Sequence, residues 1–385
     1  MSGMSTRTIG IILNGATGRI GSTQHLANAL APIRDEGGLA VGADRLVPDV
    51  LLVGRDTDKL SALGQQYSAR WSTDLDAALA DPAYAVVCDT SLTQARQAVL
   101  EKAVAAGKHV YTEKPVALSV ADGLALLAAA RARGVRHGAV EDKLYLPGFR
   151  KLSRVVAGGS LGRVVGFRLD FGWWIFDGVE VKCQRPSWNY KKREGGGLFF
   201  DMYPHWRYML EGLLGPIHRL VAAAATATPE RIDEAGARYK VDVEDTAHVL
   251  VEMESGALGA VISSWATRVR RDDLIQMQID GTRGSALAGL HRCWTQHADR
   301  MPRTPHVSVA RDAAIDYRDG WSEVEAGASF TNPYRVGWEA FLRHLHDGTP
   351  MTADLAAGIR DVQFAEACLR SVAEGKWVDL PRLTE

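Results

Sequence analysis

The stretch Asn14-Gly15-Ala16-Thr17-Gly18-Arg19-Ile20-Gly21 decides the fold, and it directly follows the apolar run Thr8–Leu13. That run is too short for the hydrophobic region of a signal peptide and has no cleavage pattern, so it predicts a buried first strand. Glycines let the backbone turn tightly, and the first turn of a following helix offers free N–H groups to an anion. Strand, glycine-rich turn and helix in this order predict the pyrophosphate-binding turn of a dinucleotide fold. The candidate cofactor-binding residues of this turn are Gly15, Thr17, Gly18, Arg19, Ile20 and Gly21; an ordinary glycine-rich turn is the alternative.

The N-terminal part of the chain alternates strand and helix signals, which is typical of a parallel sheet with helical crossovers. The predicted strands are Thr8–Leu13, Val50–Val53, Ala85–Cys88, His109–Thr112 and Val135–Val140. The predicted helices include Leu75–Leu79, Gln94–Ala106 and Ser119–Arg133, the last two ending at a glycine. We expect the stretch Gly37–Asp49, rich in Gly, Pro and charge, to form an extra loop before the second strand.

The pattern changes after about residue 140, where strand-like stretches follow one another without regular helices between them. These are Val164–Phe171, Ala247–Met253, Ala257–Trp265 and Leu274–Asp280, and helical stretches near Arg335–His346 and Ala353–Glu374 follow late in the chain. This order predicts an antiparallel sheet in a second domain. We expect a dinucleotide-binding domain over residues 1–142 and a substrate-binding and oligomerisation domain over residues 143–385, with the C-terminal helix able to pack back on the first.

Composition excludes several classes of protein. The 45 Lys and Arg residues against 46 Asp and Glu residues give a formal charge of −1, so nothing indicates a nucleic-acid partner. No apolar run approaches the ~20 residues that a membrane helix needs. The four cysteines, Cys88, Cys183, Cys293 and Cys368, are far apart in sequence, which excludes a C-x-x-C zinc pattern and suits a reducing cytoplasm.

Cofactor choice is read at the end of the second strand, where an acidic residue would bind the adenosine ribose and favour NAD. Here the strand ends in Val53-Gly54-Arg55-Asp56, with glycine at the acidic position. Arg55 could pair with a 2′-phosphate, and Asp56 could cap the next helix or reach the ribose. We lean slightly to NADP and keep NAD open.

Glu113-Lys114-Pro115 follows the fourth strand, and the carboxyl ends of such strands line the cofactor crevice. Lys114 could hold a substrate oxygen and ease its deprotonation; a surface lysine in a turn is the alternative. We place Thr90, after the third strand, together with Glu113 and Lys114, among the cofactor-binding residues.

The segment Gly195–His205 contains a carboxylate and an imidazole four residues apart. If the segment is helical, Asp201 and His205 share one face, and the carboxylate would set the tautomer of the histidine and hold its pKa at or above ~6.5. An N-cap aspartate followed by an unrelated histidine is the alternative. A zinc site would need a third ligand, and none is found, so no metal is expected.

Together these motifs resemble the Gfo/Idh/MocA family, which includes glucose–fructose oxidoreductase and inositol dehydrogenases. Weaker similarity extends over Val243–Ala247, Glu254–Ala257 and Ile279–Ser285, so it covers nearly the whole chain. The resemblance implies an N-terminal α/β Rossmann domain and an α+β C-terminal domain with a large open, mainly antiparallel sheet. It also implies that the chain is an NAD(P)-dependent enzyme acting on a CH–OH group of a sugar, cyclitol or glycoside. Lys114 would be the catalytic lysine, Asp201 the substrate-orienting aspartate and His205 the acid–base histidine.

Two departures from the family pattern concern the offset first glycine and the stretch Glu141-Asp142-Lys143, where relatives often carry arginine or asparagine. Lys143 takes that substrate-binding place in our interpretation. Short-chain dehydrogenases and epimerases are excluded because no Tyr-x-x-x-Lys pair is present, and dihydrodipicolinate reductases because their paired-histidine motif is absent. A non-catalytic regulator that binds dinucleotide and sugar on the same fold is the remaining alternative.

An aromatic-rich segment between Phe171 and Trp206 lies beside these motifs, and aromatic faces with polar partners suit a carbohydrate. The candidate substrate-binding residues are Lys143, Trp174, Arg185, Trp188, Tyr190, Asp201 and His205. Core or subunit contacts are the alternative role for the aromatics. A sheet with one open face also predicts a homodimer or homotetramer.

Overall fold

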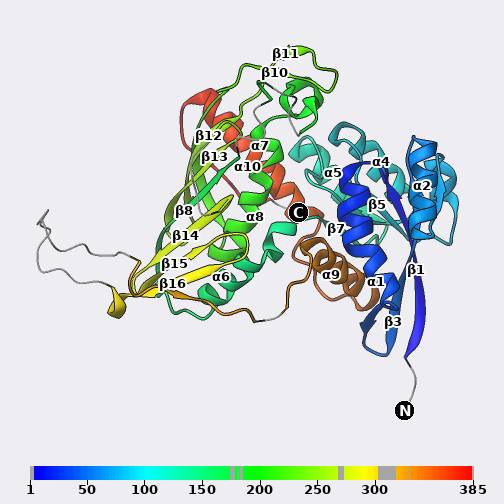
Figure 1. Cartoon of the computed structure of the whole chain (residues 1–385), viewed down its shortest axis with the longest axis horizontal. Coiled ribbons are helices and arrows are strands. Elements are labelled where there is room, and N and C mark those ends of the chain that lie inside the picture. Colours follow the sequence, from blue (N-terminus) through cyan, green and yellow to red (C-terminus); the bar gives the residue numbers. More distant parts are fainter. Residues whose placement is uncertain are drawn as a thin grey trace, which may run out of the picture.

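The computed structural model describes residues 4–173, 178–180, 182, 185–267, 273–301, 318–327 and 329–383. It has two lobes, each built on its own sheet (Figure 1). The blue and cyan N-terminal lobe holds the parallel sheet, and the green and yellow lobe holds a large open sheet. The two-domain α/β and α+β architecture expected from the sequence is confirmed.

The first sheet has the strand order β2-β3-β1-β5-β6-β7, with β4 pairing with β3. Its strands are β1 (Ser5–Asn14), β2 (Leu39–Val41), β3 (Asp44–Val53), β4 (Arg70–Ser72), β5 (Val86–Asp89), β6 (His109–Thr112) and β7 (His137–Ala139). Every pairing is parallel except that of β2 with β3. The middles of β1, β3 and β5 are buried apolar runs, as expected of strands covered on both faces.

The helices of this lobe are η1 (Ile20–Leu30), α1 (Ala31–Asp35), α2 (Thr57–Tyr67), α3 (Leu75–Ala80), α4 (Thr93–Ala105) and α5 (Val120–Ala132). Asp56, Asp74 and Ser119 cap α2, α3 and α5 through their side chains. The helix after the glycine turn is a π-helix: its last bond runs from Ala31 N–H to the Leu26 carbonyl, five residues back. π-turns are rare and occur often at functional sites.

The stretch Gly37–Asp49 is not the loop that its composition predicts. β2 and the first residues of β3 form an antiparallel hairpin, with Leu39 opposite Leu46 and Val41 opposite Asp44. Gly42 turns the chain with φ +59°. The prediction was wrong because Gly and Pro here serve a hairpin turn and a strand, and Pro48 lies opposite Ile9 in β1.

The second sheet has nine strands among the described residues, in the order β17-β16-β15-β14-β8-β13-β12-β9-β18. Its strands are β8 (Val164–Gly172), β9 (Ile217–Ala225), β12 (Thr246–Met253), β13 (Leu258–Ser264), β14 (Ile275–Gly281), β15 (Gly284–Ala288), β16 (Cys293–His297), β17 (Ser322–Glu323) and β18 (Val378–Asp379). β8 and β13 are parallel and the other pairs are antiparallel. A small ribbon, β10 (Glu230–Ile232) with β11 (Arg238–Lys240), stands apart.

Helices cover the face of this sheet that is turned toward the first lobe (Figure 1). The helices of this part are η2 (Asp142–Tyr145), α6 (Pro147–Ala157), η4 (Ser187–Tyr190), η5 (Lys192–Glu194), α7 (Leu198–Asp201), α8 (Tyr203–Leu214), η6 (Ala298–Arg300), α9 (Pro333–Asp347) and α10 (Leu355–Glu374). Alternate strand residues such as Val249 and Met277 are buried beneath these helices, whereas Leu250 is 48% exposed on the other face. Among the described residues, no helix covers the other face of the sheet.

The end of the chain returns to the first lobe. Trp338 and Phe341 of α9 belong to the core packed around β1 and η1, and Leu355 and Ile359 of α10 belong to the core around α5. Further along, Phe364 of α10 lies in the core of the second lobe. Helix α10 therefore joins the two cores, as the sequence allowed.

Candidate active site

A groove of ≈ 840 Å³ lies at the carboxyl ends of the first sheet's strands. Six of the predicted cofactor-binding residues line it, and so does Gly54, which precedes Arg55; the six are Gly15, Thr17, Gly18, Arg55, Asp56 and Thr90. Gly15 turns with φ +79°, and a Cβ there would come within 2.8 Å of the Thr90 hydroxyl. The groove therefore depends on glycine in the way a pyrophosphate cradle does.

The rest of the glycine motif shapes this groove from behind. A Cβ on Gly21 would meet the Gly15 carbonyl at 2.6 Å, so the helix can start this close to the turn only with glycine. Arg19 is exposed at the N-cap of η1, and Ile20 is the first residue of that helix. Neither side chain lines the groove. The lining residues that sequence reasoning missed include Asn14, Ser91 and Leu92, which border the glycine turn and the third strand of the prediction.

Asp56 and Arg55 differ in how they are held. Asp56 accepts from Lys59 N at 3.1 Å as the N-cap of α2 and pairs with Lys59 Nζ at 3.0 Å, and these contacts lower its pKa. Arg55 is exposed and makes no ion pair in the described part of the chain. The carboxylate is thus engaged in capping, while the guanidinium borders an open groove.

Glu113 turns inward, beneath the crevice. Its Oε1 lies 3.1 Å from His25 Nε2 on η1, and Trp338 Nε1 donates to His25 Nδ1 at 3.0 Å. Because Nδ1 is an acceptor, the neutral histidine carries its proton on Nε2 and donates to Glu113. Burial raises the pKa of Glu113, but the His25 hydrogen bond and the Lys114 charge outweigh it, so the pKa is lowered. The carboxylate anchors the backbone from which Lys114 projects.

Lys114, Asp201 and Arg185 form one cluster around the buried Asp201 carboxylate, which we name the catalytic cluster. Lys114 Nζ lies 2.9 Å from Asp201 Oδ1, and Arg185 lies 3.0 Å from Asp201 Oδ2. Burial alone would raise the pKa of Asp201, yet Arg185 and Lys114 lower it to about 2. The aspartate is therefore a permanent anion that orients two cations.

Glycines and a glutamate position the helices that carry Asp201 and His205. A Cβ on Gly196 would meet the Asn189 carbonyl at 2.4 Å, and Gly197 has φ +122°, so the chain can reach α7 only through glycines. The Glu244 carboxylate accepts from Phe199 N at 2.8 Å and satisfies the start of α7.

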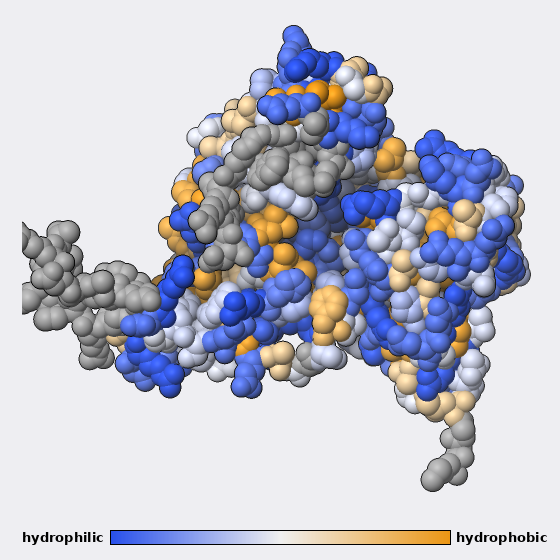
Figure 2. All heavy atoms as spheres, viewed as in Figure 1, coloured by the Kyte–Doolittle hydropathy of each residue, from blue (hydrophilic) through white to orange (hydrophobic). Residues whose placement is uncertain are grey.

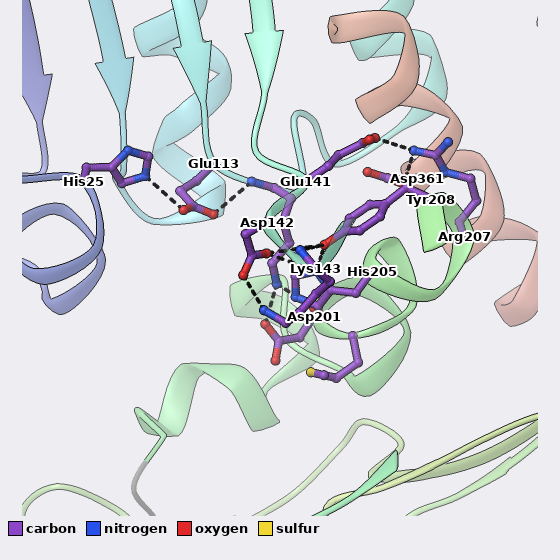
Figure 3. Close-up of polar contacts among 12 residues, drawn as sticks. His25, Glu113, Glu141, Asp142, Lys143, Asp201, His205, Arg207, Tyr208 and Asp361 are labelled. Carbon is purple, nitrogen blue, oxygen red and sulfur yellow. Dashed lines mark hydrogen bonds and ion pairs between the residues drawn. The ribbon is translucent and has the colours of Figure 1, made fainter. Parts of the chain in front are cut away.

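His205 does not pair with Asp201, contrary to the sequence-based expectation. The helix breaks at Met202, because Pro204 has no N–H to continue it, and α8 starts with a new orientation. His205 Nδ1 instead lies 2.7 Å from the Tyr208 hydroxyl. Figure 3 shows His205 beside Tyr208, with the Asp201 carboxylate directed away from them.

The predicted direction of the His205 pKa was also wrong. Burial disfavours the imidazolium, and Lys143, Lys114 and Arg185 add positive charge around it, so the pKa of His205 lies well below its ordinary value. The expectation failed because it counted one carboxylate and none of the three cations that the fold brings in.

Comparison with known proteins identifies the family. Residues 9–140 match the oxidoreductase family with an NAD-binding Rossmann fold, and residues 149–287 match the GFO/IDH/MocA C-terminal domain. The chain is 41% identical over 388 aligned positions to D-xylose dehydrogenase of Paenarthrobacter nicotinovorans, covering 98% of this chain and 99% of the relative. The chain belongs to the Gfo/Idh/MocA family.

More distant relatives agree. Levoglucosan dehydrogenase of Pseudarthrobacter phenanthrenivorans is 24% identical over 73% of this chain and 76% of its own. A solved structure titled as levoglucosan dehydrogenase in complex with NADH and L-sorbose superposes with a TM-score of 0.80 at 21% identity, covering 97% and 99% of the two chains, which supports the fold. The protein is thus a nicotinamide-dependent oxidoreductase acting on the alcohol or ketone of a sugar-like substrate, and the regulatory alternative is not supported.

For a Gfo/Idh/MocA member, the departure at Glu141-Asp142-Lys143 has a clear structural place. Lys143 Nζ pairs with Asp142 Oδ2 at 2.5 Å, and both line the approach to His205. Asp142 was not among the predicted site residues, and no periodic pattern could have found it because its partner lies 66 residues away.

The aromatic residues predicted to contact the sugar lie in different environments. Tyr190 is fully buried, where its ring stacks under Arg231 and against Trp265, so its predicted substrate contact was wrong. Trp188 is partly exposed, and Trp174 lies outside the described residues. Arg185 does reach the catalytic cluster.

A second ionic group, which is buried, centres on Arg207 of α8. Arg207 contacts Glu141 Oε1 at 2.7 Å and Asp361 Oδ1 at 2.6 Å, and Glu211 Oε2 lies 3.0 Å away. We name these four residues the interdomain cluster, because they come from the end of β7, from α8 and from α10. Sequence reasoning missed them all.

Two further findings concern metal sites and membrane-spanning helices. In the ranges that the structure describes, no group of three or more His, Cys, Asp or Glu residues is arranged to hold a metal ion. No described helix is long and apolar enough to cross a membrane.

Proposed function

We propose that the protein oxidises D-xylose or a closely related sugar and uses a nicotinamide dinucleotide as the hydride acceptor. The observation behind the proposal is that Lys114, Asp201 and His205 lie together at the carboxyl ends of the Rossmann strands. Asp201 and His205 come 87 or more residues after Lys114 in the chain. Figure 2 shows the surface hollowed where the two lobes meet, and Figure 3 places Asp201 and His205 below the strand ends. The identity to a D-xylose dehydrogenase over nearly the whole chain supports the substrate class.

In this proposal the substrate hydroxyl lies between Lys114 Nζ and His205 Nε2. Lys114 donates to the substrate oxygen, and neutral His205 accepts the hydroxyl proton as the carbon loses hydride. The nicotinamide ring accepts that hydride when the cofactor is bound. Asp201 holds Lys114 in place, so that the geometry is present before the substrate arrives.

Arg185, Lys143 and Trp188 are the substrate contacts in this proposal, and they would hold the sugar rim and one of its apolar faces. A panel of pentoses, hexoses, cyclitols and anhydro-sugars, followed at 340 nm with NAD and with NADP, tests the function. Turnover highest with D-xylose supports it, and no turnover with any aldose contradicts it.

We propose that the cofactor site accepts NADP at least as well as NAD. Asp56 is committed to capping α2, while Arg55 borders the groove without an ion pair to the described residues. Arg55→Ala should weaken NADP binding more than NAD binding in calorimetric titrations. Lys102→Ala, at an exposed ion pair on α4, is the control. Equal losses for both cofactors would mean that Arg55 does not read the 2′-phosphate.

We also propose that the protein forms a homodimer or homotetramer through the uncovered face of the second sheet. Leu250 and Leu258 lie 48% and 52% exposed on that side. Light scattering at micromolar concentration should give a multiple of 41.8 kDa, and Leu250→Glu should shift it toward the monomer. A monomeric wild type contradicts the proposal. Buried free thiols at Cys88, Cys293 and Cys368 suit work in the reducing cytoplasm.

A further inference from the structure

A short chain of hydrogen bonds leads away from the imidazole of His205. His205 Nδ1 lies 2.7 Å from the Tyr208 hydroxyl, which lies 3.3 Å from Asp142 Oδ1. The backbone N–H of Lys143 donates to the same hydroxyl at 3.1 Å. Tyr208 is 2% exposed, His205 6% and Asp142 6%, so water does not compete for these bonds. Figure 3 shows the three side chains in this order.

Counting protons assigns a direction to each bond. The Lys143 N–H can only donate, and the Asp142 carboxylate can only accept. Tyr208 has one proton, and burial and the Asp142 charge raise its pKa well above the usual value, so it keeps that proton. If Tyr208 donates to Asp142, then its oxygen accepts from both Lys143 N–H and His205 Nδ1–H, and all four groups are satisfied. If Tyr208 donated to His205 instead, the Asp142 oxygen would lose its partner in a buried place.

We propose that Tyr208 and Asp142 are positioning residues that hold the proton of His205 on Nδ1 and leave the lone pair of Nε2 free for the substrate hydroxyl. This inference rests on the proposed function, in which His205 is the base. The proton taken from the substrate stays on Nε2, while the Nδ1–H bond to Tyr208 and the charge of Asp142 stabilise the imidazolium. The roles resemble those of an aspartate behind a catalytic histidine, with a tyrosine hydroxyl inserted between them.

Charged groups from several elements face this imidazole. Lys143 and Asp142 approach from η2, Lys114 from the end of β6, and Arg185 from the segment before α7. The three cations disfavour the imidazolium, and Asp142, with an oxygen 3.8 Å from His205 Nδ1, opposes them. Without the bridging hydroxyl or the carboxylate, protonated His205 would face the cations alone.

The first test compares Tyr208→Phe and Asp142→Asn with wild type in steady-state oxidation of D-xylose. Each should lower kcat by about 10- to 100-fold with a small change in KM, at or below the low end of what general acid–base groups contribute. The pH at which kcat/KM rises should move downward in both, because the imidazolium is less stabilised. Tyr203→Phe on the same helix, whose hydroxyl donates to the Ala247 carbonyl and lies beside Ser263, is the matched control and should match wild type.

The second test asks whether the effect passes through His205. Adding Tyr208→Phe to His205→Asn should cause no further loss of kcat if Tyr208 acts only by positioning the imidazole. Additive losses, or a Tyr208→Phe enzyme with the wild-type rate and pH profile, would overturn the inference while the proposed function stands. A fully active His205→Asn would instead overturn the proposed base.

A third measurement needs no activity. In protein labelled with ¹⁵N-histidine, the His205 signals, assigned from their loss in His205→Asn, should show a protonated Nδ1 and an unprotonated Nε2 at neutral pH. In Tyr208→Phe the two tautomers should both be populated. A wild-type Nε2–H tautomer would refute the assignment even if the variants are slow.

Discussion

The catalytic cluster and the interdomain cluster both combine carboxylates with cations, but they reach opposite electrostatic states. In the catalytic cluster, two cations surround Asp201, and its pKa is lowered to about 2. In the interdomain cluster, three carboxylates surround Arg207, and burial raises the pKa values of Glu141 and Asp361. The ratio of charges, and not burial itself, decides which carboxylates stay ionised.

The two clusters also differ in the role that we expect of them, which is catalysis for the first and stability for the second. The catalytic cluster borders the hollow between the lobes and keeps two cations oriented for a substrate oxygen. Arg207 is the cation of the interdomain cluster. It links the end of β7 to α8 and α10, and it also donates to the Ala357 carbonyl. We expect changes in the first to affect turnover and changes in the second to affect stability.

The largest effect should come from Lys114→Ala. Loss of the group that donates to the substrate oxygen should lower turnover by about 10²- to 10⁴-fold, while dinucleotide affinity stays nearly unchanged. Steady-state kinetics and calorimetry measure the two quantities, with Lys102→Ala as the surface control. Near wild-type turnover would remove Lys114 from the mechanism.

Arg207→Met should affect stability, the property that we expect the interdomain cluster to support. Leaving buried carboxylates without their cation should lower the free energy of unfolding by about 3–5 kcal/mol, as breaking a buried ion pair does. Arg219→Met, which breaks a half-exposed pair with Glu252, should cost less than about 1 kcal/mol. Denaturant unfolding measures both, and equal costs would show that the cluster does not hold the lobes together.

The two clusters should respond to pH with opposite signs. Asp201 has a lowered pKa in the folded state, so its contribution is present above the ordinary value and is lost as pH falls from 3.8 toward 2, by about 2 kcal/mol in total. Asp361 has a raised pKa, so its contribution is present at low pH and is lost as pH rises. Unfolding of Asp201→Asn and Asp361→Asn from pH 2.5 upward, each against wild type, checks the signs. Parallel profiles for the two variants would contradict the comparison.

The smallest effect concerns the kinetic pH profile. For oxidation, kcat/KM should rise with pH as His205 loses its proton, with a midpoint below the ordinary ~6.5 because burial and cations disfavour the charged form. Lys143→Met removes the cation with the largest effect on the His205 pKa and should move the midpoint upward. Lys151→Met, on α6 beside Glu323, is the control. An unmoved midpoint would mean that the ionisation of a group other than His205 controls kcat/KM.

Much of the fold was determined by local patterns along the chain. The apolar run before Asn14, the glycines at 15, 18 and 21 and the helix ends at Gly107 and Gly134 each act through their own backbone, so their roles are legible in sequence. The candidate residues Lys114, Asp201, His205 and Arg185 do meet in one place. Strand ends at one edge of a parallel sheet meet by geometry, which is why that placement could be predicted.

The partners within the site were decided by tertiary structure alone. The sequence placed Asp201 and His205 on one helical face, but Pro204 breaks that helix, and His205 finds Tyr208 and Asp142 instead. Tyr190 looked like a sugar contact and is buried beneath Arg231. A pKa or a hydrogen-bond partner depends on groups many tens of residues apart in the chain, and periodicity along the chain carries no information about which of them the fold brings within 4 Å.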